Sequence, residues 1–149
     1  MAGYLEMRER VVTTLQAEVT EAARASWRGV LARVDFAPLR PGGVADCRLR
    51  SGYNVAAMRG LVDRQDPTLY TPSAAVIGEQ LRAYRDALPP GTALMPALRA
   101  IRPQTESRDA LLAAVRECRE GGATALSFYN YGFMRLETLG WIRDALAAG

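Results

Sequence analysis

The chain has 149 residues, 49% hydrophobic and 23% charged, which is the composition of one ordinary folded domain and not of a disordered chain. Its net charge is +3 and its basic residues are spread over every segment, so it lacks the clustered basic stripe of a nucleic-acid-binding protein. All 19 basic residues are arginine and there is no histidine; this excludes Ser-His and Cys-His catalytic pairs, the usual zinc sites, lysine Schiff bases and the P-loop lysine.

The remaining composition predicts neither a metal site nor a cofactor. Two cysteines are too few for a disulfide framework and match no metal-ligand spacing. Cys118 lies at helical spacing from Val115 and Leu111, which indicates a core residue, whereas Cys47 falls in a loop-like stretch and has no assigned role. The N-terminal segment carries charges where a signal peptide would be apolar, and no stretch approaches the roughly 20 apolar residues of a membrane span. We expect a cytoplasmic protein that binds no membrane.

The first half of the chain alternates helical and extended patterns. Apolar residues recur every three or four positions over 4 to about 25, which predicts a helix. Five of residues 30–36 are apolar, and this run is too short and too β-branched for a helix, which predicts a strand. Pro41-Gly42-Gly43 marks a loop, and a short helix follows it, with Asn54 as its N-cap.

The second half contains three more strand-helix pairs. Thr71 is the predicted N-cap of the first of these helices, with Pro72 at its first position. The next strand contains Pro96, which usually marks an edge or a bulge. The second predicted strand lies within 66–72, between Pro67 and Pro72, and the next two span 92–101 and 123–131. The predicted helices span 73–88, 107–120 and 135–148.

This order predicts one α/β domain over 1–149, in which a helix precedes four strand-helix units and the strands pair in parallel. Each strand has one apolar face, and its other face turns polar only near its carboxyl end, at Asp35, Arg99 and Tyr129, with Tyr70 as the counterpart on the second strand. That is the pattern of a parallel barrel whose interior is filled by apolar side chains and whose functional site lies at the carboxyl ends of the strands.

The polar strand ends are therefore the candidate site. Asp35 is the catalytic candidate, because it is the one carboxylate at a convincing strand end. Each of these residues also has a purely structural interpretation. In that interpretation Asp35 and Arg99 form an ion pair with each other, and the tyrosines cover the core with their hydroxyls in water. Asn130 then stabilises the conformation of the loop. The substrate-binding candidates are Tyr70, Arg99, Tyr129, Asn130 and Tyr131.

Several stretches resemble bacterial glycoside-hydrolase-like (β/α)8-barrel, or TIM-barrel, proteins. The sequence "ALRAIRPQTESRDALLAAVRECREGGATALSFYNYGFMRLETLGWI" is similar to their last two strand-helix units, and "YLEMRERVVTTLQAEV" and "GVLARVDF" look like the helix and strand that precede those units. The resemblance implies that the chain supplies only strands five to eight of a barrel. A half-barrel exposes two sheet edges, so we expect either a fragment of a longer enzyme or a chain that associates with itself or with an N-terminal partner.

The resemblance also implies a carbohydrate ligand, with the Tyr129 and Tyr131 rings stacking on sugars and Arg99 holding an anionic or hydroxyl-rich group. Glycoside hydrolysis usually needs two carboxylates. Because Asp66 precedes its predicted strand and should lie at the opposite end of the sheet, we do not expect the chain to catalyse hydrolysis unaided. Two other interpretations remain open: a flavodoxin-like binding or regulatory module using Gly42-Gly43, and a structural protein that interacts through its exposed sheet edges.

Overall fold

The computed structural model describes residues 2–35 and 43–148, and it has the predicted α/β class. Helices and strands alternate along the chain, as the periodicity of the sequence indicates. In chain order the elements are α1 (Ala2–Ser26), β1 (Ala32–Asp35), α2 (Gly43–Ser51), the 3₁₀ helix η1 (Val55–Met58), β2 (Arg64–Leu69), α3 (Ala74–Ala87), β3 (Ala93–Leu94), β4 (Ala97–Arg99), α4 (Arg108–Glu120), β5 (Ser127–Tyr129), the 3₁₀ helix η2 (Tyr131–Phe133) and α5 (Leu136–Ala147).

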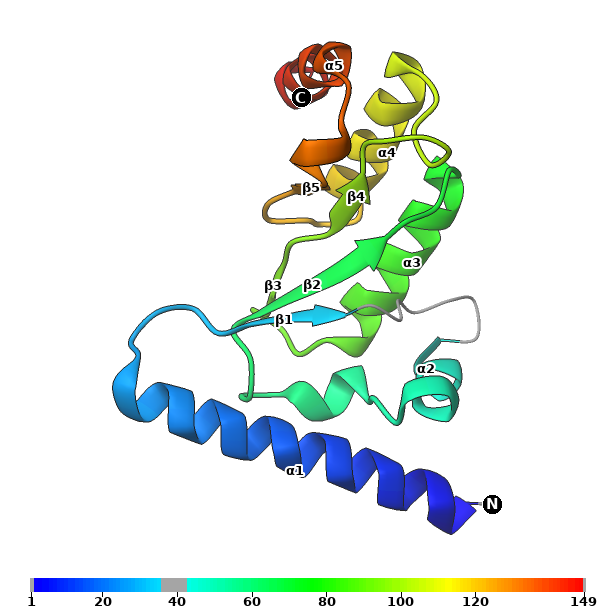
Figure 1. Ribbon diagram of the computed structural model, residues 1–149. Coiled ribbons are helices and arrows are strands. Elements are labelled where there is room, and N and C mark those ends of the chain that lie inside the picture. Colours follow the sequence, from blue (N-terminus) through cyan, green and yellow to red (C-terminus); the bar gives the residue numbers. More distant parts are fainter. Residues whose placement is uncertain (1, 36–42, 149) are drawn as a thin grey trace.

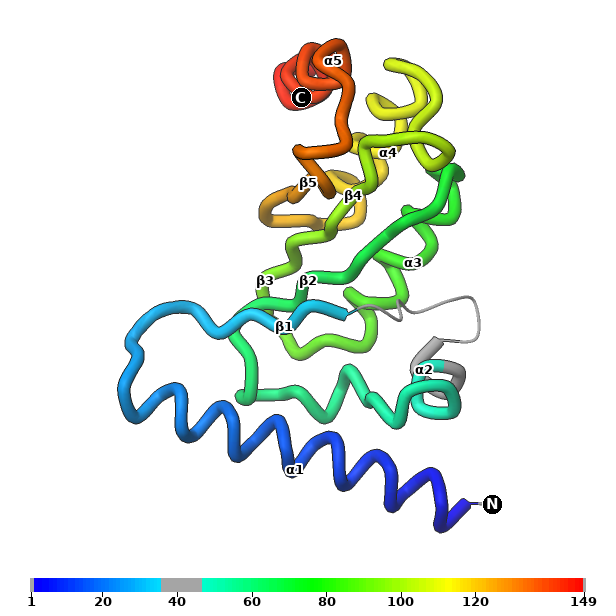
Figure 2. The backbone as a smooth tube through the Cα atoms, viewed as in Figure 1, coloured from blue at the N-terminus to red at the C-terminus, as the bar shows by residue number. Residues whose placement is uncertain are grey.

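The strands form a parallel sheet in the order β1-β2-β4-β5, with β3 also paired to β2. Spatial order thus follows chain order, and right-handed crossovers between such strands place the connecting helices on one face. Figure 1 shows α3 and α4 on that face, and the tube in Figure 2 shows that no described helix covers the other. A flavodoxin-like sheet has β1 in its interior, whereas β1 here lies at an edge, so this topology differs from the flavodoxin-like alternative.

Pro96 interrupts the third predicted strand. β3 and β4 are two short pieces of it, and Met95 and Pro96 lie between them. The ladder continues across the gap, since the Met95 amide donates to the Gln65 carbonyl at 3.0 Å and the Pro96 carbonyl accepts from the Ser127 amide at 3.0 Å. Proline lacks only a donor, so a break at this position leaves the strand order intact.

The hydrophobic core lies between the sheet and the helices α3 and α4. Strand residues Leu69 and Leu98 and helix residues Leu81 and Leu111 are all buried in it. Fully burying one such side chain contributes about 1.5–3 kcal/mol. Cys118 is also a core residue, as its helical spacing predicts.

One expectation about the first half of the chain is wrong, and a second is confirmed with a shorter helix than expected. The segment around Cys47 is not a loop, because α2 runs through it and buries Cys47 completely. The Ser51 hydroxyl donates to the Cys47 carbonyl at 2.8 Å and closes this helix. Asn54 does cap the next element, accepting a hydrogen bond from the Ala56 amide, but that element is a single 3₁₀ turn.

The N-terminus of α3 also differs from the prediction. Ser73, and not Thr71, caps this helix by accepting from the Val76 amide. The Thr71 hydroxyl instead accepts from the Ser73 amide at 3.3 Å. The N-cap therefore lies two residues later than the sequence pattern indicates, and a serine side chain satisfies the N-terminal turn.

Candidate functional site

Three predicted site residues come together at the carboxyl ends of the strands, on the sheet face that no described helix covers. Arg99 ends β4 and is paired in register with Tyr129, which ends β5. Tyr70 follows β2 directly and lies level with Arg99, because Leu69 pairs with Leu98. The Tyr70 and Tyr129 rings approach each other across β4, with centroids 5.5 Å apart and planes tilted by 30°. We call Tyr70, Arg99 and Tyr129 the tyrosine-arginine cluster.

The cluster combines two aromatic rings with a cationic donor. The buried Nε atom of Arg99 has no hydrogen-bond partner in the described part of the chain. Burial raises the pKa of Tyr70, the nearby Tyr129 raises it further, and Arg99 lowers it. Tyr70 is therefore protonated at neutral pH and offers a hydroxyl donor. This arrangement suits binding through stacking and hydrogen bonds.

The segment after β5 places two further candidates differently. The Asn130 side chain accepts from the Gly132 amide at 2.9 Å and caps η2, which is the loop role considered as its alternative. The peptide bond between Tyr129 and Asn130 is cis. Tyr131 is 75% exposed and Phe133 is similarly exposed, so both rings stand beyond the cluster in solvent. Phe133 was missed from the sequence, although it follows the tyrosines in the same segment.

Asp35 does not join the cluster. It pairs with Pro67 of β2, so it lies on the helix-covered face, where it is 5% exposed and accepts a hydrogen bond from the Tyr84 hydroxyl of α3. Its neighbour Val34 is 48% exposed on the open face. The expectation that Asp35 shares a face with Arg99 is wrong, because a shift of one residue exchanges the two faces of a strand.

A polar network on the helix-covered face was also missed. The Arg33 guanidinium lies 4.2 Å from the centroid of the Tyr53 ring and donates to the Gln16 side chain of α1 at 2.6 Å. The Tyr53 hydroxyl donates to Gln65 at 2.7 Å. Burial raises the pKa of Tyr53 above its usual range. These contacts hold α1 and β1 to the rest of the domain.

Asp66 is also placed differently from the expectation. It lies within β2, where Arg64 donates to both of its carboxylate oxygens, at 2.7 and 2.9 Å. A bidentate guanidinium pair of this kind is among the stronger charge-assisted hydrogen bonds. Asp66 is therefore already held by a neighbour and does not reach the cluster at the strand ends.

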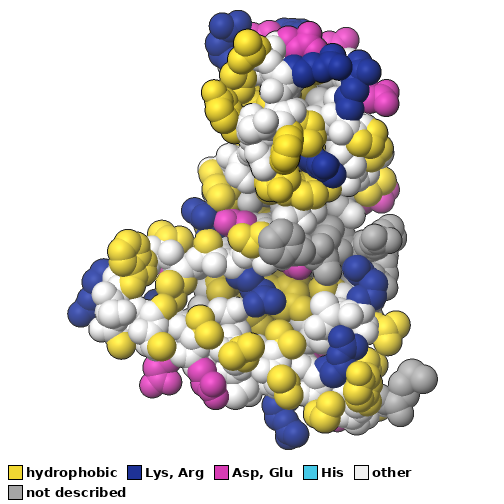
Figure 3. Space-filling model, in the orientation of Figure 1, with side chains coloured by type: hydrophobic (Ala, Val, Ile, Leu, Met, Phe, Trp, Pro, Cys, Tyr) yellow, Lys and Arg dark blue, Asp and Glu magenta, His cyan; other side chains and the backbone are white. Residues whose placement is uncertain are grey.

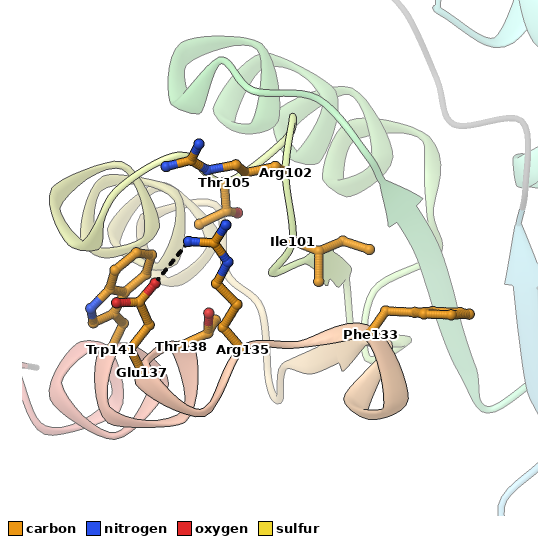
Figure 4. A pocket seen from close by; sticks show the side chains of 8 residues that line it. All are labelled: Ile101, Arg102, Thr105, Phe133, Arg135, Glu137, Thr138 and Trp141. Carbon is orange, nitrogen blue, oxygen red and sulfur yellow. Dashed lines mark hydrogen bonds and ion pairs between the residues drawn. The ribbon is translucent and has the colours of Figure 1, made fainter.

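A pocket of about 220 Å³ lies next to the cluster, between the segment that follows β4 and the start of α5 (Figure 4). Two of its side chains are arginines, one from each of these segments. Arginine residues on consecutive strand-to-helix connections were the sequence signal that could have revealed it. The pocket is lined by Ile101, Arg102, Thr105, Phe133, Arg135, Glu137, Thr138 and Trp141.

Among the described residues, no group of three acidic or cysteine side chains is arranged to hold a metal ion. No described helix has the length and apolar character needed to cross a membrane. Comparisons of the chain with models of protein families, with curated proteins and with solved structures found no match. The functional argument therefore depends on the geometry of the tyrosine-arginine cluster and the pocket.

Proposed function

We propose that this protein binds a carbohydrate or similar polyhydroxyl ligand at the carboxyl ends of its parallel strands. The observation that supports this proposal is the tyrosine-arginine cluster, in which two rings 5.5 Å apart flank a strand that ends in Arg99. Ligand sites of parallel α/β proteins are found at this end of the sheet. The tyrosine-arginine cluster places two aromatic rings, those of Tyr70 and Tyr129, at this end of the sheet.

The chemistry of the cluster matches a ligand with both apolar and polar surfaces. A sugar ring presents C–H groups that stack on the partly exposed face of Tyr129, while its hydroxyls accept hydrogen bonds from Tyr70 and Arg99. Arginine also binds carboxylates through its planar fork. A sugar acid would therefore use the cluster more fully than a neutral sugar does.

Hydrolysis is not part of the proposal. Both standard mechanisms need two carboxyl groups on either side of the scissile bond, roughly 5 to 9.5 Å apart. In the described part of the chain Asp35 faces the helices and Asp66 is held by Arg64. We therefore propose ligand binding by this chain, with any hydrolysis requiring carboxylates from elsewhere.

The proposal is tested by equilibrium binding to a panel of neutral oligosaccharides and sugar acids such as glucuronate. We expect at least one member to bind, and Tyr129→Ala to weaken that binding about tenfold, the effect of removing a central aromatic contact. Tyr4→Ala is the matched control, because Tyr4 is an exposed tyrosine on α1. Equal losses in the two variants, or no binding at about 10 mM, would contradict the proposal.

A second candidate function is self-association, and the exposed apolar side chains favour it. On α1 they recur at spacings of three and four, and Figure 3 shows hydrophobic side chains along this helix. The edge strands β1 and β5 each pair on one side only. The exposed apolar residues are Tyr4, Met7, Val11, Leu15 and Val19 on α1, and Leu136, Leu139 and Leu146 on α5.

We propose a second copy as the partner, because one chain carries both a β1 edge and a β5 edge. In a two-fold arrangement the β5 edge of each copy meets the β1 edge of the other, and α5 of one lies near α1 of the other. Such a dimer would close eight strands, the number in a (β/α)8 barrel. Light scattering should then give a dimer mass that Leu15→Lys converts to monomer. A monomeric wild-type chain at high concentration would overturn this second candidate.

A further inference from the structure

The pocket beside α5 is lined by Thr138, a largely buried threonine whose hydroxyl makes no hydrogen bond to the described residues. Thr138 is 4% exposed, and its Oγ1 atom has no hydrogen-bond partner among the described residues, whereas the Thr105 hydroxyl in the same pocket donates to the Arg99 carbonyl at 2.9 Å. In Figure 4 the Thr138 hydroxyl points from α5 toward the segment that follows β4. Because the hydroxyl faces the pocket and no described residue binds it, it is available to a molecule in the pocket.

The charged side chains of the pocket give it an excess of positive charge. Arg102 and Arg135 both line it, and the one carboxylate among its lining residues is Glu137. Arg135 contacts Glu137 at 3.4 Å, with both side chains more than half exposed, and such exposed pairs contribute little, about 0–1 kcal/mol. An incoming anion can therefore compete with Glu137 for the Arg135 guanidinium.

The first turn of α5 adds main-chain donors near the same position. Ser73 and Ser107 cap α3 and α4 with their hydroxyls, but α5 begins at Arg135 without a side-chain cap. The first amides of a helix lack internal partners and favour negative charge. This helix terminus supports the assignment of an anion. The main evidence for that assignment is the Thr138 hydroxyl and the two arginines.

We infer that the pocket binds the oxyanion group, phosphate or carboxylate, of a small molecule. Arg102 and Arg135 would hold its charge, and the Thr138 hydroxyl would donate to one of its oxygens. Ile101 and Trp141 would contact the rest of the molecule. The inference does not depend on the carbohydrate site, because none of these residues belongs to the tyrosine-arginine cluster.

The fluorescence of Trp141 provides the test. The chain has two tryptophans, so Trp27→Phe leaves Trp141 as the only reporter. In that background, inorganic phosphate and acetate are titrated separately at constant ionic strength against a chloride control. A saturable change with phosphate alone, with acetate alone or with both supports the pocket and identifies which oxyanion it prefers. A response to neither anion beyond the chloride control would overturn the inference.

Variants distinguish this site from general charge attraction. We expect Arg135→Gln to weaken binding about tenfold or more, and Thr138→Val about twofold to tenfold, as for charged and neutral hydrogen bonds. Glu137→Gln should strengthen binding, a gain that misfolding cannot produce. Arg59→Gln, at an exposed arginine outside the pocket, should have no effect. Equal loss in Arg59→Gln and Arg135→Gln, or unchanged affinity in both Thr138→Val and Glu137→Gln, would overturn the inference.

Discussion

Replacing Tyr53 by phenylalanine should reveal the energetic role of the buried polar network. The Tyr53 hydroxyl donates to Gln65 Oε1 at 2.7 Å, and Gln65 is 0% exposed. The Gln65 Nε2 atom already has no partner in the described part of the chain. Tyr53→Phe would thus remove the hydrogen bond to Gln65 Oε1 and leave both polar atoms of this buried amide without a partner in the described part of the chain. We expect this to lower the free energy of unfolding by about 1–3 kcal/mol.

A second substitution separates the lost hydrogen bond from a general packing defect. Gln65→Leu added to Tyr53→Phe removes both members of the pair, and replacing both partners by apolar groups of similar shape can be nearly neutral. Urea unfolding followed by circular dichroism gives each free energy of unfolding. We expect the double variant to be more stable than Tyr53→Phe alone, and Tyr131→Phe, at an exposed ring, to stay within about 0.5 kcal/mol of wild type. A double variant less stable than Tyr53→Phe would refute the reasoning.

Two other predictions concern the core, and a third concerns how the stability of the fold depends on pH. Leu81→Ala should lower the free energy of unfolding by about 2–5 kcal/mol in the same assay, because Leu81 is completely buried; a loss below 1 kcal/mol would contradict the assigned core. The Cys118 thiol, whose pKa burial raises to about 12, should resist alkylation at pH 8 and react once urea unfolds the chain; reaction in the native state would contradict its placement. The Leu31 amide and then Arg24 lower the pKa of Asp63, so this carboxylate stabilises the fold above its unfolded pKa of about 3.9 and loses that contribution as the pH falls through its lower folded pKa. The urea midpoints of wild type and Asp63→Asn should therefore differ at pH 7 and converge in acid, and a difference that is unchanged or larger at low pH would contradict this.

The sequence is most informative where one face of a strand is uniformly apolar. In the third strand Leu94 and Leu98 alternate with Arg99, and the structure buries both leucines against the helices. The alternation in β5 likewise puts Tyr129 level with Arg99. Alternation with a period of two determines which residues share a face, so the tyrosine-arginine cluster could be predicted from the strands alone.

The first strand shows why the position of Asp35 could not be predicted from the sequence. Its apolar set includes Val34, yet the structure exposes that side chain and buries Asp35. Tyr84 of α3, 49 positions away, supplies the partner that makes burial of this carboxylate possible. The hydrophobicity of neighbouring residues cannot predict such a distant hydrogen-bond donor. The helix around Cys47 was missed for a similar reason, since tertiary burial and not periodicity stabilises it.

The most direct test of the proposed ligand site is a map of amide chemical-shift changes in the ¹⁵N-labelled chain on addition of glucuronate or a neutral oligosaccharide. The proposal predicts that the largest changes fall at Tyr70, Arg99 and Tyr129 and in the residues directly after them. Changes concentrated instead on α1 or on the helix-covered face, with the three strand ends unaffected, would contradict it.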